Sequence, residues 1–284
     1  DSTCVAGQGF SSASASDQGA LTGSTVNDGA CALCTAGKYK TSSGARSCTA
    51  MTHTTCPPGQ GYSSTSAGGA DREGATSNDG ACTWCAAGKY KATTGTEACQ
   101  YMSSPYESTC NAGFAFSSAS AGSDLIGASA NDGACTPCAA GRYKNTPGAT
   151  NCNLMSIYTC SRGYGFSSAS ATSGITGSTN NDGTCTQCPA GEYKSGYDAS
   201  TCVTMSTTTC PAGQRFSSAS AGSDLIGAYH NDGACSLCPA GQFKSADGAT
   251  ACTDMDTNTC VAGQGFSSAV SYTHLRAHET DINL

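Results

Sequence analysis

The residues of this chain that are best suited to chemistry are paired cysteines of the form Cys-x-x-Cys, such as Cys135-Thr-Pro-Cys138. Such a pair can act as a redox dithiol, supply half of a tetrahedral zinc site, or form two structural disulfides. The sequence has 284 residues and 21 cysteines, and the pair occurs five times. The residues around each copy therefore decide between these chemistries.

Neither redox nor zinc chemistry fits the recurring pattern. The two residues between the paired cysteines change from copy to copy, and no helix is expected whose N-terminus could lower the pKa of a thiol. A zinc site needs four converging ligands, but each copy offers one pair, two separate cysteines and no recurring histidine. His53 and His230 each occur in a single copy. We therefore predict structural disulfides, with no metal and no cofactor.

The cysteines belong to an internal repeat of about fifty residues. Each copy reads, approximately, C-x-A-G-x-x-F-S-S-A-S-A, a polar stretch, N-D-G-A-C-x-x-C, then x-A-G-x-Y-K, a further loop and a fourth cysteine. The predicted repeats are residues 1–55, 56–109, 110–159, 160–209 and 210–259, followed by a partial sixth repeat at 260–269. The chain begins in phase with this pattern, as expected of a processed protein or a fragment.

Each repeat is composed of two similar half-modules, because C-x-A-G opens both of them, as in Cys210-Pro-Ala-Gly and Cys238-Pro-Ala-Gly. Four cysteines allow three connectivities, and the similarity of the half-modules favours the one in which each closes on itself. Loops of this length each contribute about 3 kcal/mol to stability when they are cross-linked. Cys260 has no predicted partner. The favoured pairs are Cys4–Cys31, Cys34–Cys48, Cys56–Cys82, Cys85–Cys99, Cys110–Cys135, Cys138–Cys152, Cys160–Cys185, Cys188–Cys202, Cys210–Cys235 and Cys238–Cys252.

The composition supports a protein that depends on cross-links and is exported. Large aliphatic and aromatic side chains are too scarce to fill one core, so disulfides must offset chain entropy. This many cysteines at regular spacing indicates an extracellular or cell-surface location. The net charge of -7 and the pI of about 4.9 argue against nucleic acid as a partner. No apolar run is long enough to form a transmembrane segment.

Three apolar residues recur in each repeat and replace a conventional core. Two are aromatic, and the third is a methionine that we expect to pack between neighbouring repeats, because its flexible thioether fills irregular gaps. Units too small to bury their own apolar faces bury them by stacking. The predicted fold is therefore a small disulfide-rich, mostly β or irregular structure that forms an elongated rod of tandem repeats. The packing methionines are Met51, Met102, Met155, Met205 and Met255.

The recurring Asn-Asp-Gly has two interpretations. Asn and Asp bond to nearby backbone, and Gly accepts a positive φ, so the motif predicts a tight turn that aims the next cysteine at its partner. A calcium site is the alternative, with Asp124 or Asp224 joining the turn aspartate. Calcium takes six to eight oxygen ligands, and unit four has Gly174 in place of that second aspartate. The turn is therefore favoured.

Residues 270–284 break the repeat abruptly. His274, His278 and Glu279 could bind a metal on a short helix. However, the segment resembles adapter-derived read-through sequence. We interpret this tail as a sequence artefact.

The half-module Cys188-Pro-Ala-Gly-Glu-Tyr-Lys, closed by Cys202, resembles the cysteine-rich CPAGxY modules of ephrin-receptor-like repeats and of ciliate surface immobilisation antigens. The pattern covers residues 1–269. The tandem Cys-x-x-Cys periodicity and the Ala/Thr/Ser-rich composition resemble the ciliate antigens best. That resemblance implies an extracellular coat protein held by a C-terminal lipid anchor.

These observations predict an extracellular structural or surface-coat protein without catalytic activity. Dense Ser and Thr suit O-linked glycans, and self-association or neighbouring coat proteins are the expected partners. A subunit of an extracellular, mastigoneme-like filament is one alternative, in which repeats of different chains associate. A ligand-binding ectodomain is the other, and Trp84 with the cluster 71–73 is the one set of residues that could form a specialised face.

Overall fold

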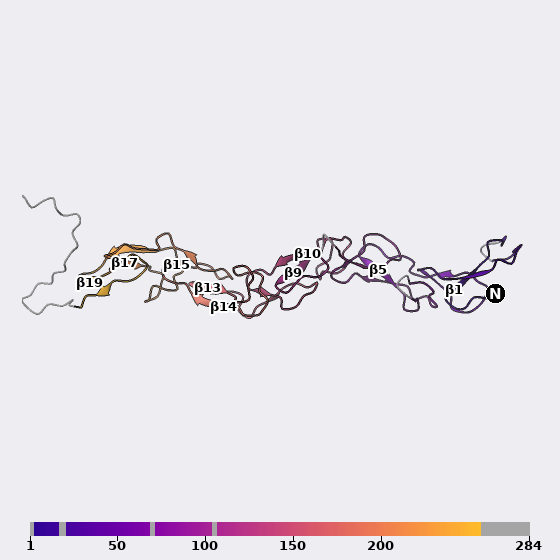
Figure 1. Ribbon diagram of the computed structural model, residues 1–284, viewed down its shortest axis with the longest axis horizontal. Helices are drawn as coiled ribbons and strands as arrows, with labels where there is room; N and C mark the ends of the chain where they lie inside the picture. The colour runs from indigo at the N-terminus through magenta and orange to yellow at the C-terminus, as the bar shows by residue number, and fades with distance from the viewer. Residues whose placement is uncertain (1–2, 17–20, 69–71, 104–106, 257–284) are drawn as a thin grey trace, which may run out of the picture. The chain divides into compact units, whose positions relative to one another are not determined.

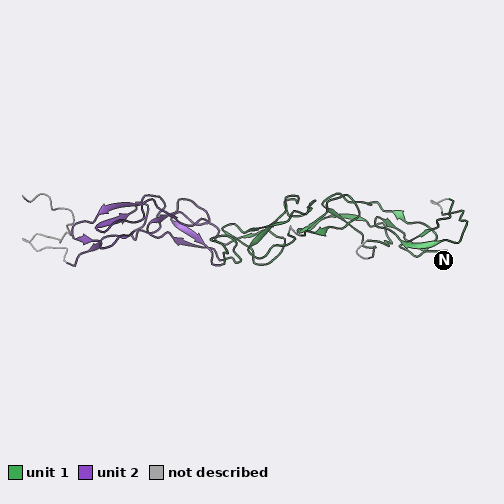
Figure 2. Ribbon diagram, turned by 45° about the horizontal axis from the view of Figure 1, so that its top comes forward, with its two compact units in different colours: residues 1–155, 170–181 green, residues 156–169, 182–284 purple. Residues whose placement is uncertain are grey.

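The computed structural model describes residues 3–16, 21–68, 72–103 and 107–256. Cys260, the partial sixth repeat and the 270–284 tail lie outside these ranges. The chain divides into two compact units, residues 1–155 with 170–181 and residues 156–169 with 182–284 (Figure 2). The described residues form short strands and turns, without a helix.

Each repeat contains two antiparallel hairpins, a longer one of four-residue strands and a shorter one of two-residue strands (Figure 1). The first unit holds the pairs β1 (Gln8–Ser11) with β2 (Ala30–Leu33), β3 (Lys38–Tyr39) with β4 (Thr49–Ala50), β5 (Gln60–Ser63) with β6 (Ala81–Trp84), β7 (Lys89–Tyr90) with β8 (Gln100–Tyr101), β9 (Phe114–Ser117) with β10 (Ala134–Pro137), and β11 (Arg142–Tyr143) with β12 (Asn153–Leu154). The second unit holds β13 (Tyr164–Ser167) with β14 (Thr184–Gln187), β15 (Glu192–Tyr193) with β16 (Val203–Thr204), β17 (Gln214–Ser217) with β18 (Ala234–Leu237), and β19 (Gln242–Phe243) with β20 (Thr253–Asp254).

The C-x-A-G sequence opens each half-module with a β-turn. The N–H of Gln8 donates to the carbonyl of Val5 over 3.1 Å, and the N–H of Lys38 donates to that of Thr35 over 3.0 Å. The third residue of each turn is a glycine, Gly7 or Gly37, with φ of 80° and 82°. A positive φ at this position is the conformation of a type II turn, which favours glycine. The shared opening of the half-modules is therefore a shared turn.

Among the described residues, ten disulfides join the cysteines in sequential order, with Cα separations of 5.4 to 5.8 Å. Every repeat thus consists of two disulfide-closed halves, as the sequence predicts. The two cysteines of each Cys-x-x-Cys have different partners: Cys135 bonds to Cys110, and Cys138 bonds to Cys152. A redox dithiol closes on itself, so these pairs function as two adjacent cross-links.

Small apolar clusters take the place of a single core. One cluster contains Met51, Cys56, Tyr62 and Ala75, all at most 4% exposed, and Tyr39 packs against it. Met51 thus shares a cluster with the second aromatic of repeat 1, Tyr39, and the first aromatic of repeat 2, Tyr62. The same combination recurs around Met102 in the first unit and Met205 in the second. Met155 is also buried, whereas Met255 is only partly buried.

Candidate functional site

A lysine is buried at the centre of each of the five described repeats, although the sequence pattern predicts only apolar residues in the interior. It is the last residue of the A-G-x-Y-K motif and follows the second aromatic. These lysines are between 1% and 8% exposed, which is rare for this residue type. They are Lys40, Lys91, Lys144, Lys194 and Lys244.

Each buried ammonium group is held by main-chain carbonyls of its own repeat. Lys40 Nζ donates to the carbonyls of Cys4, Gln8 and Gly44 over 3.0, 2.9 and 2.6 Å. Lys244 makes the equivalent contacts over 2.9, 3.1 and 2.6 Å. Burial lowers the pKa of Lys144 because it disfavours the charged form. The lysine joins the opening turn of the first half-module to the loop of the second, which no disulfide connects.

The Asn-Asp-Gly aspartate fastens the serine-rich segment of its repeat. Asp232 accepts hydrogen bonds from Ser218 Oγ over 2.5 Å, from the Ser220 N–H over 2.8 Å and from Ser220 Oγ over 3.1 Å. Burial alone would raise the pKa of Asp232, but these hydrogen bonds outweigh it and the pKa lies below its usual value of 3.8. Asp132 makes the corresponding contacts with Ser118 and Ser120.

These lowered pKa values predict acid destabilisation. The aspartate contribution is present above the unfolded-state pKa of 3.8 and is lost as pH falls through the lower folded-state value. We expect the urea midpoint of the disulfide-intact chain to fall below about pH 4, and Asp232→Asn to reduce that dependence. Asp224→Asn removes an exposed carboxylate from the same repeat and is the control. An unchanged pH profile in the Asp232 variant would show that its hydrogen bonds do not stabilise the fold.

The structure corrects the predicted role of the Asn-Asp-Gly glycine. None of these glycines has a positive φ. Instead, there is no room for a side chain: a Cβ on Gly233 would lie 2.4 Å from the Thr207 carbonyl and 3.0 Å from Met205 Sδ. Glycine is needed here because the preceding linker packs closely on it.

The asparagine of this motif binds the linker of the preceding repeat. Asn78 Oδ1 accepts the Thr52 N–H over 2.8 Å, and its Nδ2 donates to Thr52 Oγ1 over 2.8 Å. Asn231 makes the same pair of bonds with Ser206. The motif therefore combines three functions, one per residue: attachment to the preceding linker, attachment to the serine-rich segment, and close packing.

Successive repeats also meet through their main chains at a recurrent junction. In the second unit, Gly227 N–H donates to the Cys188 carbonyl over 2.7 Å, and Lys194 N–H donates to the Ala228 carbonyl over 3.1 Å. The same two bonds join Cys34 and Lys40 to the Gly74–Ala75 pair in the first unit. Junction formation buries Ala75 and Ala228 completely.

Glycines of the opening turn allow this close approach. A Cβ on Gly163 would lie only 2.2 Å from the Gly227 carbonyl oxygen, whereas a Cβ on Gly213 would meet no described atom within 4 Å. Both residues have a positive φ, 76° and 80°. Asparagine tolerates this conformation better than other residues with a side chain. The two positions thus share their backbone geometry, but only Gly163 has a described residue against it.

We expect Gly163→Asn to destabilise the junction by about 1–3 kcal/mol, because the new side chain must displace a main-chain carbonyl. Gly213→Asn shares the cost of a side chain at positive φ, about 1 kcal/mol, but lacks this clash, so it should be the less destabilising of the two variants. Hydrogen exchange of the Lys194 and Gly227 amides reports the junction directly. Equal exchange in the two variants would mean that backbone strain, and not the neighbouring repeat, makes glycine necessary.

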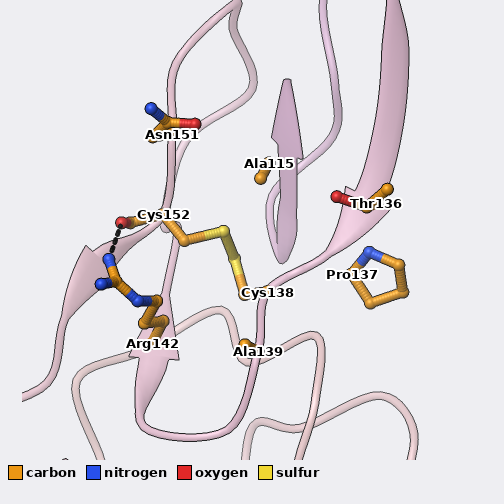
Figure 3. A pocket seen from close by; sticks show the side chains of 8 residues that line it. All are labelled: Ala115, Thr136, Pro137, Cys138, Ala139, Arg142, Asn151 and Cys152. Carbon is orange, nitrogen blue, oxygen red and sulfur yellow. Dashed lines mark hydrogen bonds between the residues drawn. A yellow bond between two sulfur atoms is a disulfide. The ribbon is translucent and has the colours of Figure 1, made fainter. Parts of the chain in front are cut away.

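A hollow of about 390 Å³ lies beside the Cys138–Cys152 disulfide of the third repeat (Figure 3). Figure 3 shows Arg142 and Asn151 on the Cys152 side, with Thr136 and Pro137 along β10. Arg142 Nη1 donates to the Cys152 carbonyl over 3.3 Å. One nitrogen of the Arg142 guanidinium is thus already used in a hydrogen bond within its own half-module.

Of the residues that the sequence singled out in repeat 2, Trp84 and Arg72 lie next to junctions between repeats. Trp84 is 61% exposed, and its ring faces Gly127 of the next repeat, where a Cβ would lie 2.7 Å from it. Arg72 has a positive φ of 55° in the loop that leads to the junction, and Asp71 lies outside the described residues. Trp84 therefore lies at the junction with repeat 3, and Arg72 lies in the loop that forms the junction with repeat 1.

Within the described residues, no three His, Cys, Asp or Glu side chains are grouped so that they could hold a metal ion. No helix among them could cross a bilayer. The sequence matches no protein-family profile, and no curated protein is significantly similar to it.

Proposed function

We propose that this chain is an extracellular structural protein, a surface-coat component without catalytic activity. One observation carries the proposal: the same disulfides, buried lysine, aspartate bonds and junction recur from repeat to repeat. The chemically capable side chains are used for internal cross-links. Disulfides at this density are typical of secreted and cell-surface proteins. A repeated architecture in which neighbours contact one another suits a load-bearing or covering role.

Labelling with a membrane-impermeant amine reagent on intact producing cells tests the location. Exposed lysines such as Lys38 should be labelled before lysis, whereas the buried Lys40 should react only after reduction and denaturation. Labelling of Lys38 only in lysed cells would contradict a surface role. Rapid labelling of Lys40 in the native protein would contradict the buried position.

O-linked glycans are part of this proposal, and the hydrogen bonds restrict where they attach. Ser218 and its equivalents use their hydroxyl groups on the aspartate of their repeat, so a glycan there would disrupt the fold. Thr201, Thr204 and Thr209 are exposed and are better acceptors. We expect the intact mass of native protein to exceed that of the bare chain, with glycopeptides containing such threonines. A mass equal to the bare chain would exclude glycans.

A subunit of an extracellular filament is the second candidate. The junction supports it, because a main-chain interface that recurs within one chain can also form between chains.

A further inference from the structure

The hollow of repeat 3 has space because of one alanine. Ala115 of β9 lines the hollow together with the Cys138–Cys152 disulfide. In repeats 1, 2 and 4 the equivalent residue is a glycine, and a Cβ there would lie 2.7 to 2.8 Å from a sulfur of the corresponding disulfide, too close for a carbon atom. The methyl group of Ala115 therefore holds the strand and the disulfide further apart. The equivalent glycines are Gly9, Gly61 and Gly165.

Three polar side chains line the hollow and keep free donors or acceptors. Arg142 uses one nitrogen on the Cys152 carbonyl, and among the described residues no carboxylate pairs with it. The hydroxyl of Thr136 and the side-chain amide of Asn151 have no described hydrogen-bond partner. Figure 3 shows Asn151 and Thr136 on opposite sides of Ala115, with the Thr136 hydroxyl directed toward it. The hollow thus combines a cation, a hydroxyl and an amide.

Repeat 5 fills the same place with a side chain of its own. Arg215 stands at the Ala115 position there, and its cross-strand partner Ser236 corresponds to Thr136. Arg215 Nε donates to Ser236 Oγ over 2.9 Å. A polar group therefore binds at this place in repeat 5, whereas the corresponding place in repeat 3 is open to a ligand.

The hollow has an apolar floor and an open mouth. Its floor is the buried disulfide, with Cys138 1% and Cys152 8% exposed, and Pro137 adds an apolar wall. The three polar side chains are exposed, so a ligand enters from solvent. Ligand pockets usually measure about 300–1,000 Å³, and the hollow is at the small end of this range. It therefore suits one ring of a longer molecule.

We propose that this hollow binds one acidic sugar, a hexuronate residue of an extracellular glycan. Its carboxylate accepts hydrogen bonds from the remaining N–H groups of Arg142, whose planar guanidinium matches a carboxylate. Its hydroxyl groups pair with Thr136 and Asn151, which can both donate and accept. Its C–H face packs on Pro137 and the disulfide. The proposal rests on the surface role proposed above and names a partner for it.

Two variants of the full chain remove the site and keep the fold, because each introduces the residue that another repeat has at that position. Arg142→Gln copies Gln242 of repeat 5 and removes the cation. Ala115→Gly copies Gly61 of repeat 2, so that the disulfide can approach the strand and close the hollow. Arg162→Ala removes an exposed arginine of repeat 4, where repeats 1, 3 and 5 have alanine, and is the control for net charge.

Binding is measured by NMR titration of the disulfide-intact chain with glucuronate, glucose, acetate and inorganic phosphate. Glucuronate should shift the Asn151 side-chain amide and the Cys138 N–H in a saturable manner. Glucose lacks the carboxylate and acetate lacks the hydroxyl groups, so each should bind about tenfold more weakly or less. Arg142→Gln and Ala115→Gly should each weaken glucuronate binding by about tenfold or more, and Arg162→Ala should leave it unchanged.

Absence of a saturable shift with glucuronate would overturn the proposal, as would unchanged affinity in Arg142→Gln or Ala115→Gly. Acetate or phosphate that binds as tightly as glucuronate would show a general anion site that does not recognise a sugar, which also contradicts it. Surface labelling of intact cells does not depend on this titration. A failure to bind glucuronate therefore leaves the proposed location intact.

Discussion

Reduction of the disulfides is expected to unfold every repeat at neutral pH. Each cluster buries only a methionine, an aromatic ring, a cysteine and an alanine, so little apolar surface holds a repeat together. A bridge over a loop of this length contributes about 3 kcal/mol. A unit of about fifty residues has a net stability of about 2.5–7.5 kcal/mol at the usual value per residue. Two bridges are therefore comparable with the whole stability of a repeat.

Hydrogen exchange before and after reduction and alkylation measures this effect. The Met205 N–H, which donates to the Gly191 carbonyl over 2.9 Å, should be protected in the oxidised chain and exchange at the rate of an unstructured peptide in the reduced chain. A local version is the double variant Cys188→Ala/Cys202→Ala, which should release the short half of repeat 4 and leave repeat 2 protected. Slow exchange that persists after complete alkylation would show that the clusters hold the repeats without covalent help.

Replacement of a buried lysine should have the next largest effect. Lys40→Met keeps the aliphatic part of the side chain but removes three hydrogen bonds to carbonyls. Hydrogen bonds to charged groups contribute about 1.5–3 kcal/mol each. The carbonyls of Cys4 and Gly44 keep a second, main-chain partner when the ammonium group is removed, so these two carbonyls are not left unpaired. We therefore expect a loss of about 2–3 kcal/mol in the free energy of unfolding, less than the sum of three such bonds. The two half-modules of repeat 1 should then open relative to each other while both disulfides remain intact.

Lys38→Met is the matched control, because Lys38 lies two residues away in the same motif and is exposed. It should change stability by less than about 0.5 kcal/mol. The exchange rate of the Gly44 N–H, which donates to the Cys4 carbonyl over 2.9 Å, reports the contact locally. Equal rates in the two variants would mean that the Lys40 ammonium does not connect the half-modules.

The cross-links of this fold could be predicted from spacing because they follow from local similarity. C-x-A-G opens both half-modules. If the two half-modules are similar, each is closed by the same kind of disulfide, and each disulfide then lies within its own loop. The positions of Met51 and Tyr62 follow from the same repetition, since an apolar residue that recurs in a polar chain must be buried somewhere. These features need no knowledge of how distant segments approach one another.

The polar centre could not be predicted in this way. The lysine recurs in all five copies, while the residue two positions before it varies from Lys38 to Glu192. This recurrence indicated a structural role for the lysine. However, lysine is ordinarily a surface residue, so its burial could not be predicted from the recurrence alone. Its burial depends on three carbonyls converging from two half-modules. The Asn-Asp-Gly glycine was wrongly assigned to a positive φ for a similar reason. The Thr207 carbonyl that excludes a side chain from Gly233 belongs to the preceding linker, and nothing local to the motif reveals it.

Disulfide mapping of native protein by mass spectrometry, under denaturing and non-reducing conditions, tests most directly whether sequential sulfur bridges hold these repeats. We predict peptides that link each cysteine to the next within its half-module, such as Cys110 with Cys135 and Cys138 with Cys152. Peptides that join the two halves of a repeat, or a majority of free thiols, would contradict the account.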